Sequence, residues 1–106
     1  MMSILVPFDK DEAMTTHNAA LEAARAERTI RLWCEQHGIG RRIAGGPWRV
    51  SRCALAMLLD GDMAALAAYR ARGRGDPLAA PYFARCGLGR LTKAVVATPR
   101  PSVFGV

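Results

Sequence analysis

Arginines concentrated between positions 25 and 52 are the residues with the clearest chemical potential in this sequence. The stretch contains seven arginines against two acidic residues, and lysine occurs only at positions 10 and 93. A guanidinium group forms a planar fork that matches phosphate oxygens and the edge of guanine. Arg28 and Arg31 are long enough to reach base edges in a major groove. Phosphate or minor-groove contacts are predicted for Arg41, Arg42 and Arg49.

These arginines also have a purely structural interpretation. Arg28 and Arg31 would then form a solvated helix face, and the other three would be edge-strand charges that discourage aggregation. Further along the chain, a DNA-backbone role and a solubilising role remain equally open for a second basic stretch. That stretch comprises Arg70, Arg72, Arg74 and Arg90.

Cysteine and histidine residues offer metal binding as a second chemistry. Cys34 and His37 have the spacing of zinc ligands. The remaining cysteines, Cys53 and Cys86, do not form a second closely spaced ligand pair. Helical periodicity places Cys34 and Cys53 on core-facing positions, where cysteine behaves as a small hydrophobic residue. His17 and His37 have carboxylates nearby, but no nucleophile, paired acid or phosphate-binding loop supports catalysis. We therefore predict no catalytic residue, metal site or cofactor.

Length and composition limit the function classes further. The chain has 106 residues, of which 51% are hydrophobic and 23% are charged, enough for one domain with its own core. Its formal net charge of +6 is typical of a small domain with an anionic partner. No apolar run reaches the roughly 18–20 residues that span a bilayer. Residues 1–10 lack signal-peptide features and three cysteines are an odd number, which together predict a cytoplasmic protein.

Two helices are predicted to position the first of the arginines. Thr15 or Thr16 caps a helix over residues 18–24, which is rich in strong helix formers. A tight polar break at residues 25–27 separates it from a second helix over residues 28–37. Gly38 then suits the left-handed position that ends a helix. The second helix is predicted to bury Ile30, Trp33, Cys34 and His37 and to expose Arg28, Arg31 and Glu35.

A hairpin is predicted to position the remaining arginines. Residues 42–44 and 48–50 favour short strands around the turn signal Gly45-Gly46-Pro47. Trp33 and Trp48 are predicted to pack where the hairpin meets the second helix. Two capped helices are predicted to follow. Ser51 caps residues 52–59, Asp62 caps residues 63–72 before Gly73, and Met63, Leu66 and Tyr69 share a buried stripe.

The two ends of the chain carry weaker signals. Residues 1–14 are predicted to be an N-terminal extended segment, because positions 4–6 favour strand. The predicted domain covers residues 15–73. Residues 74–106 are predicted to be an irregular basic arm that orders only against a partner, although residues 91–97 are compatible with a strand. Pro99-Arg100-Pro101 within this arm is a short candidate partner peptide.

The ordered fragments over residues 18–59 resemble the MerR-like excisionase DNA-binding domains, which include recombination directionality factors of phages and integrative elements. The matching text begins with Asn18-Ala19-Ala20 and Arg28-Thr29-Ile30-Arg31-Leu32-Trp33. It continues with Gly45-Gly46-Pro47-Trp48-Arg49-Val50 and Ser51-Arg52-Cys53-Ala54-Leu55. The turn Ala24-Arg25-Ala26 departs from the Gly-Val-Ser of the family, Leu32 replaces a common arginine, and Pro47 replaces a common wing arginine.

The resemblance implies a winged helix-turn-helix, mainly α with a small β-hairpin, here with an extra C-terminal helix. It adds Arg25, Thr29 and Arg52 to the predicted DNA contacts. It also implies a bacterial or phage excisionase that is associated with the nucleoid and is not an enzyme. Such a protein binds repeated sites in double-stranded DNA beside an attachment site and favours integrase-mediated excision. Many relatives instead regulate transcription, and a protein-interaction module that has lost DNA binding is a further alternative. Residues 63–72 and the C-terminal arm are predicted to support self-association on DNA.

Overall fold

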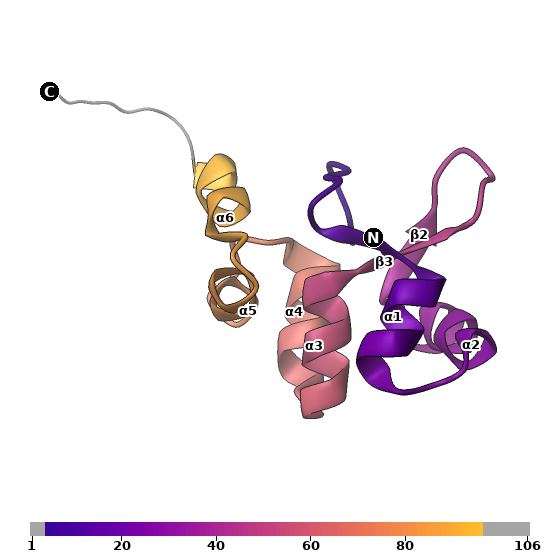
Figure 1. Ribbon diagram of the computed structural model, residues 1–106. Helices are drawn as coiled ribbons and strands as arrows, with labels where there is room; N and C mark the ends of the chain where they lie inside the picture. The colour runs from indigo at the N-terminus through magenta and orange to yellow at the C-terminus, as the bar shows by residue number, and fades with distance from the viewer. Residues whose placement is uncertain (1–3, 97–106) are drawn as a thin grey trace, which may run out of the picture.

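The computed structural model describes residues 4–96 of the chain. The molecule is mainly helical and has one small antiparallel sheet, as predicted (Figure 1). The elements in chain order are β1 (Ala13–Thr15), α1 (Thr16–Ala23), α2 (Glu27–His37), β2 (Gly40–Arg42), β3 (Trp48–Ser51), α3 (Arg52–Asp60), α4 (Met63–Arg72), α5 (Ala80–Arg85) and α6 (Gly89–Val96).

Local capping signals fix the two helices that precede the hairpin. The hydroxyl of Thr15 accepts a 3.1 Å hydrogen bond from the amide of Asn18, so α1 begins two residues earlier than predicted. Ala24 closes α1 with a φ of 57°, in the left-handed region that usually selects glycine. Gly38 ends α2 in the same region, as predicted. The start of α1 and the end of α2 therefore follow from local sequence, whereas Ala24 and the uncapped start of α2 carry no such signal.

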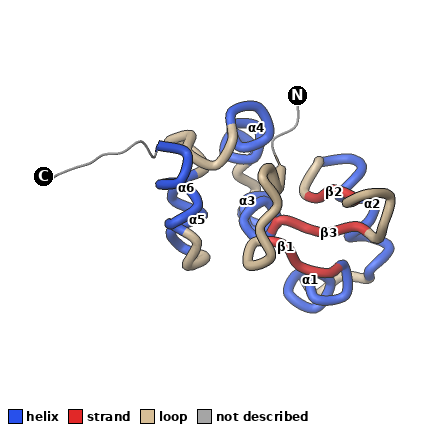
Figure 2. The backbone as a smooth tube through the Cα atoms, turned by 90° about the horizontal axis from the view of Figure 1, so that it is seen from above, coloured by secondary structure: helices blue, strands red, loops and turns tan. Residues whose placement is uncertain are grey.

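The sheet has the strand order β1-β3-β2, with β3 in the middle (Figure 2). β1 is not among the predicted elements, because its three residues have no alternating pattern of their own. It forms by antiparallel pairing with β3, where Met14 lies opposite Val50. Figure 2 shows α1 beside β1 and α2 beside β2 and β3, so the sheet and the first two helices pack as one unit.

The prediction of an extended N-terminal segment is wrong for its first described residues. Residues 4–7 form turns and bends, and Leu5 has a φ of 54°. Ile4 and Leu5 are both buried in the common core. Their strand propensity is overridden because packing in this compact turn covers their whole apolar surface. Residues 1–3 lie outside the described part.

The hairpin forms, but its first strand lies at residues 40–42, two positions earlier than predicted. Gly40 allows this register, because a Cβ atom there would lie only 2.4 Å from the carbonyl oxygen of Arg49. The hairpin turn (residues 43–46) is closed by a 2.9 Å hydrogen bond from the Gly46 amide to the Ile43 carbonyl. Its central residues Ala44 and Gly45 have φ values of 53° and 75°. Positive φ at both positions is the signature of a type I′ turn.

Two further caps begin α3 and α4 as predicted. The side chains of Ser51 and Asp62 each accept a hydrogen bond from the amide three residues further on. Leu66 and Tyr69 are buried, which confirms part of the predicted stripe of α4. Met63 is 46% exposed, so its inclusion in that stripe was wrong. It is the first residue of α4 and lies at the edge of the core.

The predicted irregular arm is helical over much of its described length. α5 packs on the core through Phe83, whose ring meets the ring of Tyr69 edge-on at a centroid distance of 5.2 Å. Residues 91–96 of the possible strand at residues 91–97 are instead part of α6, and residue 97 lies outside the described part. A short apolar run does not by itself distinguish a strand from a helix. Here the segment packs against α5 as a helix. Residues 97–106, including Pro99-Arg100-Pro101, lie outside the described part.

Candidate nucleic-acid interface

One face of α2 is buried and the other presents arginine. Ile30 and Cys34 are buried, while Trp33 and His37 are half-buried beside them. The predicted inward face is therefore correct. The opposite face carries exposed Arg28, Arg31 and Glu35, with Leu32 between them.

The start of α2 is open to solvent. Ala26 precedes the helix and supplies no side-chain cap. Arg25 is exposed in the same turn and makes only a 3.4 Å contact with the neighbouring carbonyl oxygen of Ala24. Thr29, also a predicted DNA contact, is half-buried. Amides in the first turn of a helix attract anions, so this helix end favours an anionic partner.

Glu27 is the acidic residue nearest to this helix end. Its carboxylate lies 3.3 Å from the Thr16 hydroxyl and 3.2 Å from Nδ1 of His17. It lies 4.0 Å from a guanidinium nitrogen of Arg31. The carboxylate is therefore held mainly by α1, which leaves Arg31 only weakly paired.

The hairpin carries arginines on both of its faces. Arg41 lies directly opposite Arg49 on one face, and both are half-buried. Arg41 donates a 3.3 Å hydrogen bond to the carbonyl oxygen of Leu5, which ties the hairpin to the N-terminal turn. Arg42 and Trp48 lie opposite each other on the second face, which also carries buried Val50. Like charges opposite each other on a strand pair repel, so the first face favours an anion.

Most arginines of residues 25–52 lack an acidic partner. Apart from the 4.0 Å approach of Arg31 to Glu27, the structure records no carboxylate within 4.0 Å of them over residues 4–96. Arg52 instead reaches the backbone carbonyl of Asp11 at 3.4 Å. We call this set the N-terminal arginine group; its members are Arg25, Arg28, Arg31, Arg41, Arg42, Arg49 and Arg52.

The C-terminal arginine group, defined as Arg72, Arg74, Arg85 and Arg90, has the opposite environment. Arg85 pairs with Asp60 at 3.0 Å. Arg90 pairs with Asp9 at 3.1 Å and with Asp11 at 2.7 Å. Arg72 pairs with Asp76, and Arg74 with Glu12 at 2.7 Å. Of the predicted basic stretch, Arg72, Arg74 and Arg90 are therefore neutralised, and buried Arg74 is excluded from any surface contact. Arg70 has no carboxylate within 4.0 Å among residues 4–96, and its Nε is buried.

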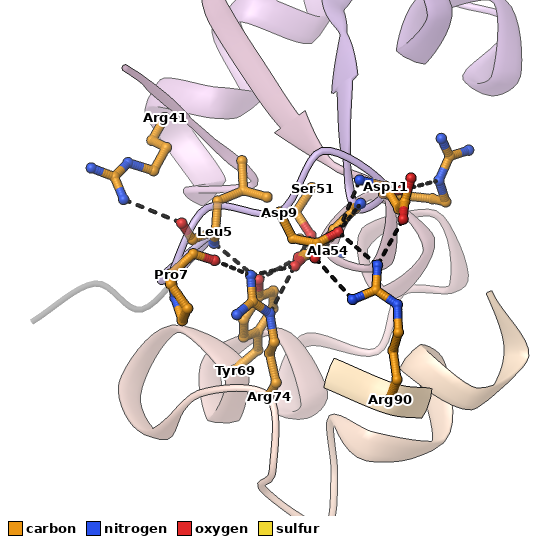
Figure 3. A network of polar contacts seen from close by, with 12 residues as sticks. Leu5, Pro7, Asp9, Asp11, Arg41, Ser51, Ala54, Tyr69, Arg74 and Arg90 are labelled. Atoms are coloured by element: carbon orange, nitrogen blue, oxygen red, sulfur yellow. Dashed lines mark hydrogen bonds and ion pairs between the residues drawn. The ribbon is translucent and has the colours of Figure 1, made fainter. Parts of the chain in front are cut away.

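Glu12 and Arg74 form a buried network that sequence reasoning missed (Figure 3). The hydroxyls of Ser51 and Tyr69 both donate hydrogen bonds to the Glu12 carboxylate, and Arg74 donates to it from the other side. Burial and the adjacent Glu12 charge raise the pKa of Tyr69. The network joins the start of β1, the end of β3, α4 and the segment after α4. No local pattern around Glu12 signals it.

The same network supports the hairpin indirectly. Leu5 donates its amide to the Tyr69 hydroxyl at 3.0 Å, and Arg74 reaches the carbonyl of Pro7 at 2.6 Å. The Leu5 carbonyl in turn accepts the hydrogen bond from Arg41. Figure 3 shows these contacts running without interruption from α4 through the N-terminal turn to the hairpin. They hold Arg41 in a defined place on the sheet.

The cysteines lie in apolar surroundings. Cys34 and Cys53 are buried, as their helical positions predict. Burial raises the pKa of Cys34 to about 11 and also raises the pKa of Cys53, which keeps both as thiols. Within residues 4–96 the structure contains no cluster of three or more His, Cys, Asp or Glu side chains able to hold a metal ion. No helix in this range is long and apolar enough to cross a membrane.

Comparisons with known proteins add no family assignment. No family model matches the chain, and neither the curated proteins nor the solved structures yield a match. The functional argument therefore depends on the residues and their geometry.

Proposed function

We propose that this protein binds double-stranded DNA through the N-terminal arginine group. The observation that carries the proposal is the contrast in pairing: these arginines lack carboxylate partners, apart from the weak approach of Arg31, whereas the C-terminal group is paired. A set of arginines without acidic partners on one helix, its preceding turn and an adjoining hairpin favours a polyanion with regularly spaced charges.

The finer fold that we propose is a winged helix-turn-helix. The order of two helices, a short turn between them, a hairpin and a capped helix supports it. The resemblance of residues 18–59 to MerR-like excisionase domains supports it as well. In this arrangement α2 is the recognition helix and the β2–β3 hairpin is the wing.

The two elements then have different tasks. Arg28 and Arg31 on the exposed face of α2 read base edges in the major groove. Arg41 and Arg49 on the hairpin contact phosphates, which positions the protein on the duplex without reading sequence. Arg25, beside the open start of α2, contacts the phosphate backbone at the groove edge.

Binding to duplex DNA as a function of salt tests the proposal. Roughly four phosphate contacts per protein predict a log–log slope of about −3.6 for the association constant against salt concentration. Fluorescence anisotropy with a labelled duplex measures it. Absence of duplex binding at low salt would reject the proposal and favour the protein-interaction alternative.

The cellular role that we propose is that of an excisionase-like architectural factor acting with an integrase. Footprinting on DNA next to the encoding gene separates this role from promoter regulation. Several regularly spaced protected repeats support the architectural role, and a single palindrome at a promoter supports regulation. Self-association on DNA through α4 would use exposed Met63 and neighbouring alanines, because Leu66 and Tyr69 are buried in the protein's own core.

A further inference from the structure

The hairpin turn contains a residue in an unfavourable backbone conformation. Ala44 has a φ of 53°, where the Cβ atom of an L-residue crowds the following carbonyl oxygen. Gly45, the next residue, adopts a φ of 75° without this penalty. A type I′ turn favours Asn-Gly, Asp-Gly or Gly-Gly at these positions, so Ala44 weakens the turn locally. Interactions from outside the Ala44-Gly45 pair must therefore offset the backbone strain at Ala44.

The guanidinium of Arg42 is bonded directly to this turn. Its Nε donates to the carbonyl oxygen of Gly46 at 2.8 Å, and its Nη2 donates to that of Gly45 at 2.9 Å. The two acceptors are the residues that come directly after Ala44, so the bonds connect the end of β2 to the far side of the turn. A guanidinium presents two parallel donors in a rigid plane, whereas a lysine ammonium does not.

We propose that Arg42 is a positioning residue that holds the hairpin turn and does not itself contact DNA. A fixed turn keeps Arg41 and Arg49 in register on the adjoining strands. The effect of Arg42 on DNA affinity therefore rests on the proposed DNA-binding function. The inference therefore removes Arg42 from the DNA contacts of the N-terminal arginine group, and it revises the direct phosphate or minor-groove contact that the sequence predicts for this residue.

Salt dependence separates the two roles. Loss of the two bonds in Arg42→Ala is expected to weaken duplex binding about five- to tenfold. Its log–log salt slope stays equal to that of the wild-type protein, since no phosphate contact is lost. Arg42→Lys, which keeps the charge but not the fork, is expected to behave like Arg42→Ala. Arg49→Ala is the matched control, and there the slope becomes shallower by about 0.9.

A rescue variant tests the same idea without relying on charge. Adding Ala44→Gly to Arg42→Ala removes the backbone strain, so the turn forms without its brace and most of the affinity returns. Hydrogen exchange at the Gly46 amide, which closes the turn, provides a measurement independent of DNA. Exchange is expected to accelerate at least several-fold in Arg42→Ala and to slow again in the double variant.

Opposite results would overturn the inference. These are a shallower salt slope in Arg42→Ala, full affinity in Arg42→Lys, no recovery with Ala44→Gly, or unchanged exchange at Gly46. If the wild-type protein itself fails to bind duplex DNA, the proposed function fails instead. The exchange experiment then still decides whether Arg42 holds the turn.

Discussion

The N-terminal and C-terminal arginine groups show how one residue type serves two purposes in a small protein. Arg85 and Arg31 have similarly exposed side chains, at 55% and 50%, yet Arg85 lies 3.0 Å from a carboxylate and Arg31 lies 4.0 Å from one. Arg90 holds two carboxylates from the segment before β1. The difference teaches that pairing in the fold, more than the number of basic residues, indicates which arginines are available to an anionic partner.

Apart from Asp76, which pairs with Arg72 four residues earlier, the acids that neutralise the C-terminal group come from distant parts of the chain. Asp9, Asp11 and Glu12 precede the sheet, and Asp60 ends α3. These pairs fasten the last two helices and the segment after α4 to the rest of the molecule. Arg72, Arg74 and Arg90 of the second basic stretch therefore contribute to the fold through ion pairs, whereas Arg41 and Arg42 in the hairpin bond only to backbone carbonyl oxygens.

Removal of Glu12 is expected to have the largest effect of any change that tests this comparison. In Glu12→Ala, the Arg74 guanidinium stays buried without its partner, which lowers the free energy of unfolding by about 3–5 kcal/mol. Urea denaturation measures the change. Glu22→Ala is the matched control, because Glu22 is exposed and its removal is expected to change stability by less than about 0.5 kcal/mol.

A double variant separates pairing from packing at this site. Replacing Glu12 and Arg74 together by leucine leaves no unpaired charge, so it is expected to destabilise the protein less than Glu12→Ala alone. A loss below about 1 kcal/mol in Glu12→Ala would mean that the network does not hold the fold together.

The second largest effect is expected on DNA affinity from the N-terminal group. Arg31→Ala is expected to weaken binding to a preferred duplex by about 1–3 kcal/mol while weakening an unrelated duplex much less, since a base contact is lost. Arg85→Ala is the control with similar side-chain exposure and is expected to leave both affinities unchanged. Competition binding with the two duplexes measures the difference. Equal losses in the two variants would remove the distinction between the groups.

Much of the first half of the fold follows from local sequence. The caps at Thr15, Ser51 and Asp62 and the glycine at Gly38 act on their own neighbours, so helix positions are predictable within about two residues. The exposure of Arg28 and Arg31 likewise follows from helical spacing. These parts of the candidate site need no knowledge of distant contacts.

The missed features depend on contacts between distant residues. β1 exists only by pairing with β3, and Glu12 meets Arg74 across 62 positions of the sequence. α5 is held by the packing of Phe83 against Tyr69. The bonds of Arg42 to the hairpin turn depend on the exact end of β2, which strand propensity locates only approximately. Side-chain pairing is therefore the part of the site that sequence patterns did not reveal.

A smaller effect is expected from the exposed pair of Asp60 and Arg85. Asp60→Asn is expected to lower the free energy of unfolding by about 0.2–1 kcal/mol, the usual range for an exposed ion pair. It also removes one of the carboxylates that bond the Tyr82 hydroxyl. Burial and the carboxylates of Asp62 and Asp60 raise the pKa of Tyr82 to about 12. Absorbance titration is expected to give a lower pKa in Asp60→Asn; an unchanged pKa would contradict the contact.

The smallest effect is expected in mild acid, where the pairing of Arg90 becomes weaker. The hydrogen bond from Arg90 holds the pKa of Asp9 below its ordinary value. A carboxyl group whose pKa is lower in the folded protein stabilises it above the ordinary pKa, and this contribution is lost as pH falls through the lowered pKa. Urea midpoints measured from neutral pH to about pH 3 should therefore decline more steeply in the wild-type protein than in Arg90→Gln. Parallel curves would show that this pair leaves stability unaffected, and that Arg90 is as available to an anion as Arg28.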